Sequence, residues 1–277
     1  MNTLVKIVVF CLFPIATFSQ PTIDIYLNSH PYPSRGSTIE SIEDNYELVI
    51  NGVQPKPFKV SMMFDKVGNI VSEIKYGKSG GTLSETKWEY NQNSKLVRKN
   101  HRYFVNMLGW KVDEVQITYS DTTGYISDIL IIKNGALLSN SKVFCDSQGK
   151  PFEVRVLDDK GAFTMIEKIG YSPNANLIRV MVLKSTNQFV SRWLYPIDPL
   201  KPYQSGQIER KYYPNDDVML ESLEDSTKID QGYFYEYNYD GQGNWIEKTT
   251  YQVTLGKNGK IKDKKLEHKI SRTIKYY

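Results

Sequence analysis

A repeated unit of about 26 residues constrains the fold of this 277-residue chain more than any other feature. Each copy has an aromatic residue that ends an alternating segment, then a short polar turn, then an apolar run. The successive separations are 26, 29, 25 and 27 residues for Phe64, Tyr90, Tyr119, Phe144 and Tyr171, and 26 for Tyr213 and Tyr239. A regular period of this kind indicates a repeat architecture.

The turns between these runs share a chemical pattern. The tetrapeptide Asp-x-x-Gly begins at Asp65, Asp121, Asp146, Asp158 and Asp240. An aspartate at the first position of a type I turn accepts backbone N–H groups, and a glycine at the fourth adopts the left-handed conformation that closes a bulged hairpin. We therefore expect these aspartates to form turns and not to act as catalytic acids or bases.

The segments beside the turns alternate with a period of two, as β-strands do. Two runs, 129–132 and 177–183, are apolar on both faces and predict strands covered on both sides. No long helical stripe appears. We predict an all-β fold: a long antiparallel meander of repeated β-hairpins with about 14 to 18 strands. A sheet of that size must be strongly twisted or curled, and the sequence leaves open whether it is open, curled or closed.

The chain divides into three predicted segments. Residues 1–19 resemble a signal peptide, because Lys6 precedes a ten-residue apolar run and small residues precede a cut before Gln20. Residues 20–57 form an N-terminal entry segment with a short strand pair near Tyr46. Residues 58–277 form the β-hairpin repeat domain, with a candidate break at 196–206, where Pro196, Pro199 and Pro202 interrupt any regular ladder.

Export to the periplasm, the cell surface or the medium follows from this reading. Cys11 lies within the apolar run, and the bulky residues before it do not fit a lipid-attachment motif. Cleavage leaves Cys145 as the single cysteine, so no intramolecular disulfide forms, and its predicted role is a small apolar core residue.

Two units resemble the YD-repeat (RHS-like) family. They are Tyr239-Asp240-x-x-Gly243-Asn244-Trp245-Ile246 and Phe64-Asp65-x-x-Gly68-Asn69-Ile70. The resemblance covers residues 58 to 277, with looser copies at Tyr119, Phe144 and Tyr171. It implies a β-shell or spiral in an exported protein, often linked with carbohydrate or surface binding and without catalytic residues in the repeats. This chain is shorter and more degenerate than the family's large members.

Charge argues against a nucleic-acid partner. Without Lys6 the chain has 34 basic and 31 acidic residues, which is close to balance. Residues 256–277 hold eight Lys and Arg against two acidic residues. That segment is either a solvated face that guards an edge strand or a patch for an anionic glycan or cell surface.

No motif for catalysis, a metal or a cofactor stands out. The three histidines, His30, His101 and His268, are far apart, and no paired-cysteine motif occurs. The string 77–81 has the spacing of a nucleophile elbow, but a strand is expected after it where the elbow needs a helix. We therefore predict no catalytic residue, no metal site and no cofactor, and we do not predict an enzyme.

The predicted function is an exported, non-catalytic binding module of the cell envelope or the extracellular space, with carbohydrate as the candidate ligand. A glycan or surface protein is the expected partner, with no nucleic acid and no membrane span after signal cleavage. The aromatic surplus near one hairpin supplies the candidate ligand-binding residues, Tyr233, Tyr235, Tyr237, Trp245 and Tyr251.

Four alternatives remain at this stage. The aromatic stripe packs the sheet core instead of binding a ligand. The protein is a structural or protein-interaction scaffold of the envelope. It is an outer-membrane β-barrel, which the charges of His268 and Arg272 in the last strand oppose. It is an enzyme whose carboxylates assemble from distant strands.

Overall fold

The computed structural model describes residues 20–28, 32, 34–48, 58–203, 208–223, 231–256 and 260–277. The predicted signal peptide and His30 lie outside the described residues. The described chain contains one short α-helix, one 3-10 turn and 17 strands in a single sheet. The all-β antiparallel meander predicted from the repeat is confirmed.

The elements follow one another in simple order. They are α1 Asp24–Leu27, β1 Ile39–Leu48, β2 Lys59–Phe64, β3 Ile70–Tyr76, β4 Thr82–Tyr90, β5 Leu96–Val105, β6 Gly109–Tyr119, β7 Ile126–Lys133, β8 Ala136–Cys145, β9 Pro151–Asp158, β10 Phe163–Ser172, η1 Pro173–Ala175, β11 Leu177–Lys184, β12 Phe189–Pro196, β13 Ile208–Tyr212, β14 Val218–Leu223, β15 Gln231–Tyr239, β16 Trp245–Leu255 and β17 Ile261–Tyr276.

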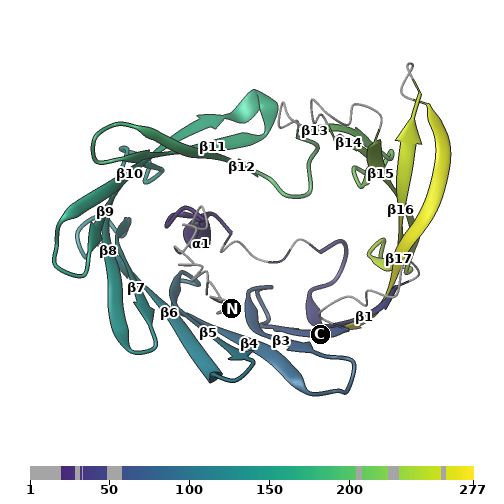
Figure 1. Ribbon diagram of the computed structural model, residues 1–277, viewed down its shortest axis with the longest axis horizontal. Coiled ribbons are helices and arrows are strands. Elements are labelled where there is room, and N and C mark those ends of the chain that lie inside the picture. Colours follow the sequence, from purple (N-terminus) through teal and green to yellow (C-terminus); the bar gives the residue numbers. More distant parts are fainter. Residues whose placement is uncertain are drawn as a thin grey trace, which may run out of the picture.

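The sheet curls into an incompletely closed ring (Figure 1). Strand β1 pairs with β2 on one side and with the last strand, β17, on the other. Each later strand pairs with its successor, but no register of the described residues pairs β12 with β13. The opening lies at the predicted break, 196–206. Whether it separates two units, and whether 20–57 is a separate entry segment, stays a prediction.

The hairpin turns explain the repeat. The Oδ1 atoms of Asp65, Asp146, Asp158 and Asp240 each accept two backbone N–H groups of their own turn. The glycines that close these turns all have φ between +80° and +89°. The turn prediction is therefore confirmed at these four positions.

Asp121 differs from the other turn aspartates. In its turn the N–H of Gly124 donates to the carbonyl of Ser120, and the Asp121 carboxylate accepts none of the described hydrogen bonds. Asn91 takes the aspartate's role one unit earlier, since its Oδ1 accepts the N–H groups of Asn93 and Lys95. In the turn of Asp121 the glycine N–H bonds the carbonyl four residues earlier instead of three, and this one-residue shift changes which side chain accepts the backbone N–H groups of the turn.

A bulge follows the turn in most units. In six hairpins the register shifts so that the second residue of the following strand is extra: Val71, Val97, Ser127, Phe152, Met219 and Ile246. Bulges increase the local twist of a sheet. Their repetition beside the same edge helps the sheet curl.

Turns alternate between the two edges of the ring. The proximal edge carries the turns β2–β3, β4–β5, β6–β7, β8–β9, β10–β11, β13–β14 and β15–β16; the distal edge carries those between β3–β4, β5–β6, β7–β8, β9–β10, β11–β12 and β16–β17. Figure 1 shows the distal hairpins splayed outward around the circumference.

The N-terminal helix fills one side of the ring interior (Figure 1). Ile23 of α1 is completely buried and Leu27 nearly so. They pack against inner-face residues of β5 to β12, among them Ile129, Val154 and Val180. Burying each such side chain stabilises the fold by about 1.5–3 kcal/mol. This contact between α1 and the inner face forms the largest apolar core of the described chain.

Among the described elements none packs over the outer face, since the strand contacts run between sheet neighbours. The prediction that 177–183 is covered on both sides holds only in part: on the outer face Leu177 and Leu183 are buried, but Met181 between them is 36% exposed. The outer residues of β7, Leu130 and Ile132, are half-buried. Apolar side chains face outward here without an element packed over them.

Candidate functional site

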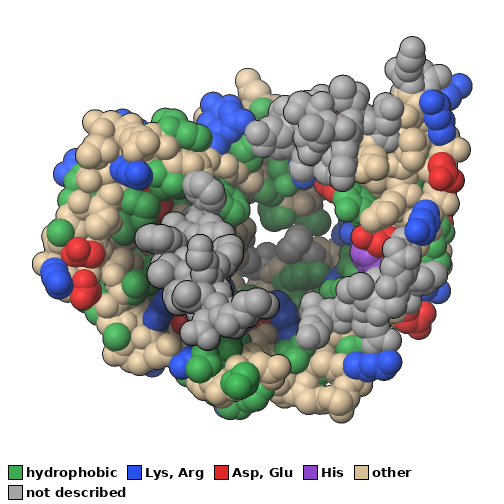
Figure 2. Space-filling model, in the orientation of Figure 1, with side chains coloured by type: hydrophobic (Ala, Val, Ile, Leu, Met, Phe, Trp, Pro, Cys, Tyr) green, Lys and Arg blue, Asp and Glu red, His purple; other side chains and the backbone are tan. Residues whose placement is uncertain are grey.

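The interior of the ring is hollowed beside α1 (Figure 2). A cavity of about 430 Å³ lies between the helix, the inner face of β2 to β5 and the chain at Pro196 and Pro199. Its wall includes Leu27, Tyr32, Met62, Ile70, Trp88 and Lys99. The size and the mixture of apolar wall with one cation are typical of a small-ligand site.

Lys99 and Trp88 face each other across the ladder between β5 and β4. The Nζ atom of Lys99 lies 5.6 Å from the centre of the Trp88 ring. Within the described residues Lys99 forms no ion pair, whereas its neighbour Lys75 is paired with Glu73 at 3.0 Å. A cation against an indole face is held without having its charge neutralised.

Burial lowers the pKa of Lys99 below the ordinary lysine value, and the positive charge of Lys75 lowers it further. Asp24 and Glu73 act in the opposite direction. Asp24, on α1, also lines the cavity, where the side-chain amides of Gln20 and Asn28 donate to it. The cavity wall thus carries one cation that forms no direct ion pair with the described residues and one hydrogen-bonded carboxylate, Asp24.

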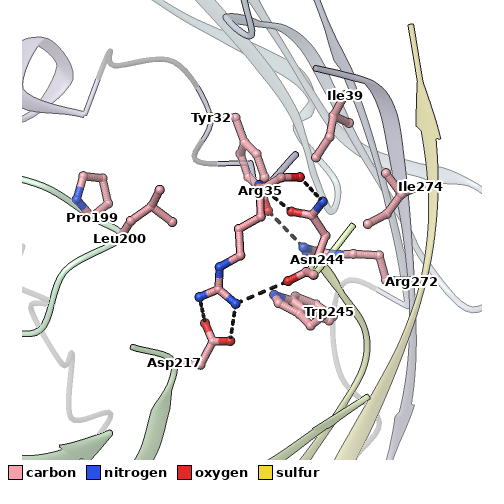
Figure 3. Close-up of a pocket in the computed structure, with 11 residues that line it drawn as sticks. Tyr32, Arg35, Ile39, Pro199, Leu200, Asp217, Asn244, Trp245, Arg272 and Ile274 are labelled. Atoms are coloured by element: carbon pink, nitrogen blue, oxygen red, sulfur yellow. Dashed lines mark hydrogen bonds and ion pairs between the residues drawn. The ribbon is translucent and has the colours of Figure 1, made fainter. Parts of the chain in front are cut away.

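A second, smaller cavity of about 170 Å³ lies beside the first and shares Tyr32 and Pro199 with it. Figure 3 shows Arg35 forming a bidentate ion pair with Asp217. Its two terminal nitrogens lie 3.0 and 3.1 Å from the two carboxylate oxygens. The amide of Asn244 accepts the Arg35 N–H at 2.8 Å and donates to the Arg35 carbonyl at 2.6 Å. The N-terminal segment is therefore fastened to two proximal turns.

Arg272 is the other paired cation of this second cavity. It donates to both oxygens of Asp44 at 2.7 Å and to the Tyr32 hydroxyl at 2.9 Å. Its guanidinium lies 3.4 Å from the centre of the Trp245 ring. The guanidinium groups of Arg35 and Arg272 are both bound to carboxylates of other elements, so these residues hold the ring together.

The five aromatic residues predicted from the sequence do not share one surface. Tyr235, Tyr237 and Trp245 lie on the inner face, and the pleat places Tyr233 with them. The Tyr235 hydroxyl donates to Glu221, and the Tyr237 hydroxyl donates to the Val218 carbonyl. Tyr251 lies on the opposite face, where it donates to Glu236.

Cations cover several of these rings. Lys248 lies 4.3 Å from the Tyr235 ring centre and 5.7 Å from that of Tyr237, and Lys264 lies 3.7 Å from that of Tyr251. Burial lowers the pKa of Lys248, as it does for Lys99. None of the five side chains is fully buried, and their role in ligand binding stays a prediction.

Sequence reasoning missed the residues that the structure brings together. Trp88 and Lys99 belong to a pair of strands with no unusual motif. The signal for Asn244 was present, because it follows the glycine in the best-matched unit, and Asn69 holds the same place in the other. The Asn69 side chain donates to Asp65, and the carbonyl of its neighbour Gly68 accepts the N–H of Tyr32. The two best-matched units thus hold the same segment.

The titratable groups named in the sequence have structural partners. His101 contacts the hydroxyl of Thr86 at 2.9 Å and His268 that of Thr250 at 3.1 Å, and burial lowers the pKa of both. The Cys145 thiol, whose pKa burial raises, donates to the Ile126 carbonyl. In the described ranges no group of three or more His, Cys, Asp and Glu side chains is placed to hold a metal ion.

The basic C-terminal segment lies in the middle of the ring and not at an edge, because β17 pairs with both β16 and β1. Lys264 and Lys269 pair with Glu236 and Glu247, each at 2.7 Å. The edge-guard interpretation of this segment was therefore wrong. Among the described residues no helix is long and apolar enough to cross a membrane.

The comparisons with known proteins give distant structural similarity. No protein-family model and no curated protein matches the chain. A porin-like protein from Bacteroides uniformis aligns with a TM-score of 0.45 at 14% identity, over 87% of this chain and 100% of that chain. A porin-like protein from Bacteroides vulgatus aligns with a TM-score of 0.29 at 9% identity, over 87% of this chain and 99% of that chain.

Part of the Photorhabdus luminescens Tc holotoxin pore also aligns, with a TM-score of 0.34 at 13% identity. That alignment covers 76% of this chain and only 14% of the toxin chain. None of these similarities is high enough to assign a family or an activity. The functional argument therefore rests on the residues of this chain.

Proposed function

We propose that this protein is an exported, non-catalytic β-repeat protein that binds a small ligand inside its ring, in the cell envelope or the extracellular space. The export signal and the YD-repeat resemblance of the sequence support the location and the class. The single observation that carries the binding role is the cavity beside α1, with Lys99 held against Trp88 and without a counter-ion in the described residues.

The chemistry of the wall favours an acidic carbohydrate unit. An indole face packs against the C–H groups of a sugar ring, and a buried ammonium attracts a carboxylate more strongly than one in water. Asp24 supplies acceptors for sugar hydroxyls from the opposite side of the cavity. The cavity volume of about 430 Å³ accommodates a ligand of one or two sugar units.

The test is a glycan array that presents neutral and acidic sugars to the purified protein. Binding to acidic glycans, lost in Lys99→Met and in Trp88→Phe, is the expected result. Lys150→Met is the matched control, since this lysine lies 5.9 Å from the Tyr171 ring at the proximal edge, away from the cavity. Trp245→Ala tests the aromatic group predicted from the sequence.

The pH dependence separates the cavity from the surface. Because the pKa of Lys99 is lowered, its positive charge is lost at a lower pH than that of surface lysines. Binding of an acidic ligand should therefore weaken as the pH rises toward the ordinary lysine range. Binding that is insensitive to both Lys99→Met and Trp88→Phe would contradict the proposed site.

The second candidate is a structural or protein-interaction scaffold of the envelope. The observation that favours it is the network of Arg272, Asp44, Tyr32 and Trp245, in which the interior charges are paired with each other. Concentration-dependent assembly without binding to any glycan would support the scaffold over the binding module.

A further inference from the structure

The distal edge of the ring carries a repeated outward-facing apolar pair. In each of four successive hairpins, two residues that are partners across the strands lie just before the turn, on the outer face. The pairs are Phe104 with Trp110, Ile132 with Leu137, Leu157 with Phe163, and Leu183 with Phe189. Leu255 and Ile261 form the same kind of pair at the β16–β17 hairpin.

At least one member of each of the first four pairs is well exposed, with Phe189 the most exposed at 59%. The turn between β5 and β6 adds Met107, which is fully exposed, and Leu108 at 66%. Single exposed apolar residues are common on protein surfaces, but here the exposed pair recurs at the same position of four hairpins on one edge. We call these residues of the four hairpins β5 to β12 the distal apolar belt.

Lysines accompany the belt at the turns of the same edge. Lys78, Lys133, Lys160 and Lys184 lie in or beside four distal turns, are exposed, and form no ion pair with the described residues. The acidic residues at these turns are Asp158 and Asp159. Basic, apolar tips are a combination that anionic lipid surfaces attract.

The proximal edge has the opposite character. Its hairpin turns carry six aspartates, Asp65, Asp121, Asp146, Asp216, Asp217 and Asp240, against Lys66, Lys95 and Lys150. Its turns expose Val67, and the strand ends beside them expose Met63, Phe144, Phe152 and Ile246. The ring is therefore polarised in charge, with basic turns at the distal edge and acidic turns at the proximal edge, and the repeated outward pair of apolar partners belongs to the distal edge.

We propose that the distal edge docks on an anionic phospholipid bilayer, with the distal apolar belt inserted at the headgroup level and the lysines on lipid phosphates. Phe and Trp side chains favour that depth, and lysines reach the phosphates with their long stems. The protein lies on the membrane by this edge and does not span it. This inference is independent of the ligand proposed for the ring interior.

The geometry favours a bilayer over a protein partner. The four pairs of the belt lie at the tips of distal hairpins that follow one another along the ring from β5 to β12. One flat partner placed against the outer wall would reach only a few hairpins. A planar, fluid surface perpendicular to the ring axis meets all the tips of one edge together.

Vesicle flotation with the purified protein tests the proposal. We expect the protein to float with vesicles of phosphatidylcholine and phosphatidylglycerol and to float less with phosphatidylcholine alone, with salt reducing the difference. The double variant Met107→Ser and Leu108→Ser should lower the bound fraction at least about fivefold. Both side chains are in solvent, so the fold should tolerate the change.

Matched variants at the proximal edge serve as controls. Val67→Ser changes an apolar turn residue that is 60% exposed, and it should leave flotation unchanged. Lys133→Glu with Lys184→Glu should reduce binding to anionic vesicles, while Lys66→Glu with Lys150→Glu should not. Circular dichroism of each variant confirms that the sheet is retained.

Three results would overturn the proposal. The first is absence of flotation with anionic vesicles. The second is an equal loss of binding in the distal and proximal variants. The third is concentration-dependent oligomers in sedimentation velocity that Met107→Ser with Leu108→Ser abolishes, without vesicle binding; this would make the belt an interface between copies of the chain.

Discussion

Glu167 illustrates how one residue can fix an element from a distance. Its side chain is 1% exposed, and its two oxygens accept the N–H groups of Thr22 and Ile23 at 2.5 and 3.0 Å. The free N–H groups at a helix start favour a nearby negative charge. Burial raises the pKa of this carboxyl nonetheless, against the effect of the two backbone donors.

The raised pKa predicts a direction for the pH dependence of stability. The folded chain holds the proton of the Glu167 carboxyl more tightly than the unfolded chain, in which the pKa of this group is about 4.5. The corresponding stabilisation is complete below that pH and is lost as the pH rises through the folded pKa. The free energy of unfolding of wild type relative to Glu167→Gln should therefore fall as the pH rises above 4.5 in urea titrations.

Glu153→Gln is the control, because Glu153 lies on the outer face and pairs with Arg155 at 2.8 Å. A difference between wild type and Glu167→Gln that stays constant with pH would contradict this account.

At the level of the element, the turns show which aspartates matter. Asp146 accepts the N–H groups of Gln148 and Lys150 at 2.8 and 2.9 Å, whereas Asp121 accepts none of the described hydrogen bonds. Asp146→Ala should lower the free energy of unfolding by about 1 kcal/mol, and Asp121→Ala by much less. Equal losses in chemical denaturation would show that the two turns are stabilised alike.

Alanine substitutions at two turn glycines distinguish the cost of backbone strain from the cost of a steric clash. Gly149 and Gly161 have nearly the same φ, +80° and +82°, so alanine is strained at both. An added Cβ at Gly161 meets nothing within 4 Å, while at Gly149 it meets the Tyr125 ring at 2.6 Å. Gly161→Ala should cost about 1 kcal/mol and Gly149→Ala clearly more, as measured by thermal unfolding. A smaller cost at Gly149 would contradict the contact with Tyr125.

The strands were predictable because their signals are local, whereas α1 was not. The alternation of residues 233–239 and the turn residues at 240–243 mark a hairpin within a dozen residues. Helix α1 has four residues and no side-chain cap of its own. The N–H groups of Thr22 and Ile23, just before the helix, are accepted by Glu167, about 145 positions away, so no local pattern announces it.

The aromatic site could be predicted only as a stripe. The tyrosines of β15 share a face, as expected from the pleat. The bulge at Ile246 reverses the alternation of β16 after Trp245, so Tyr251 pairs with Phe234 and lies on the other face. Trp88 and Lys99 gain their significance from α1, which closes the cavity over them. That neighbourhood depends on tertiary packing, which a single sequence does not encode by spacing.

The whole molecule depends on one long-range pairing, between β1 and β17. These strands begin more than 200 residues apart, and their contact joins the two ends of the meander into a ring. Closing so long a loop costs chain entropy. No local sequence pattern indicates whether the strand pairing offsets this cost, so the sequence could not show whether the sheet is open, curled or closed. The interior cavity and the polarised edges both follow from this closure.

A disulfide between β1 and β17 tests that closure most directly. Glu43 and Thr273 are partners in the ladder, and antiparallel partners bring their Cα atoms within disulfide range. Glu43→Cys with Thr273→Cys, in a Cys145→Ser background, should oxidise to a cross-linked species with faster mobility in non-reducing gels. The control pair, Glu43→Cys with Glu247→Cys, joins strands that are not neighbours and should keep free thiols. Free thiols in the first pair, with the sheet intact by circular dichroism, would contradict the ring.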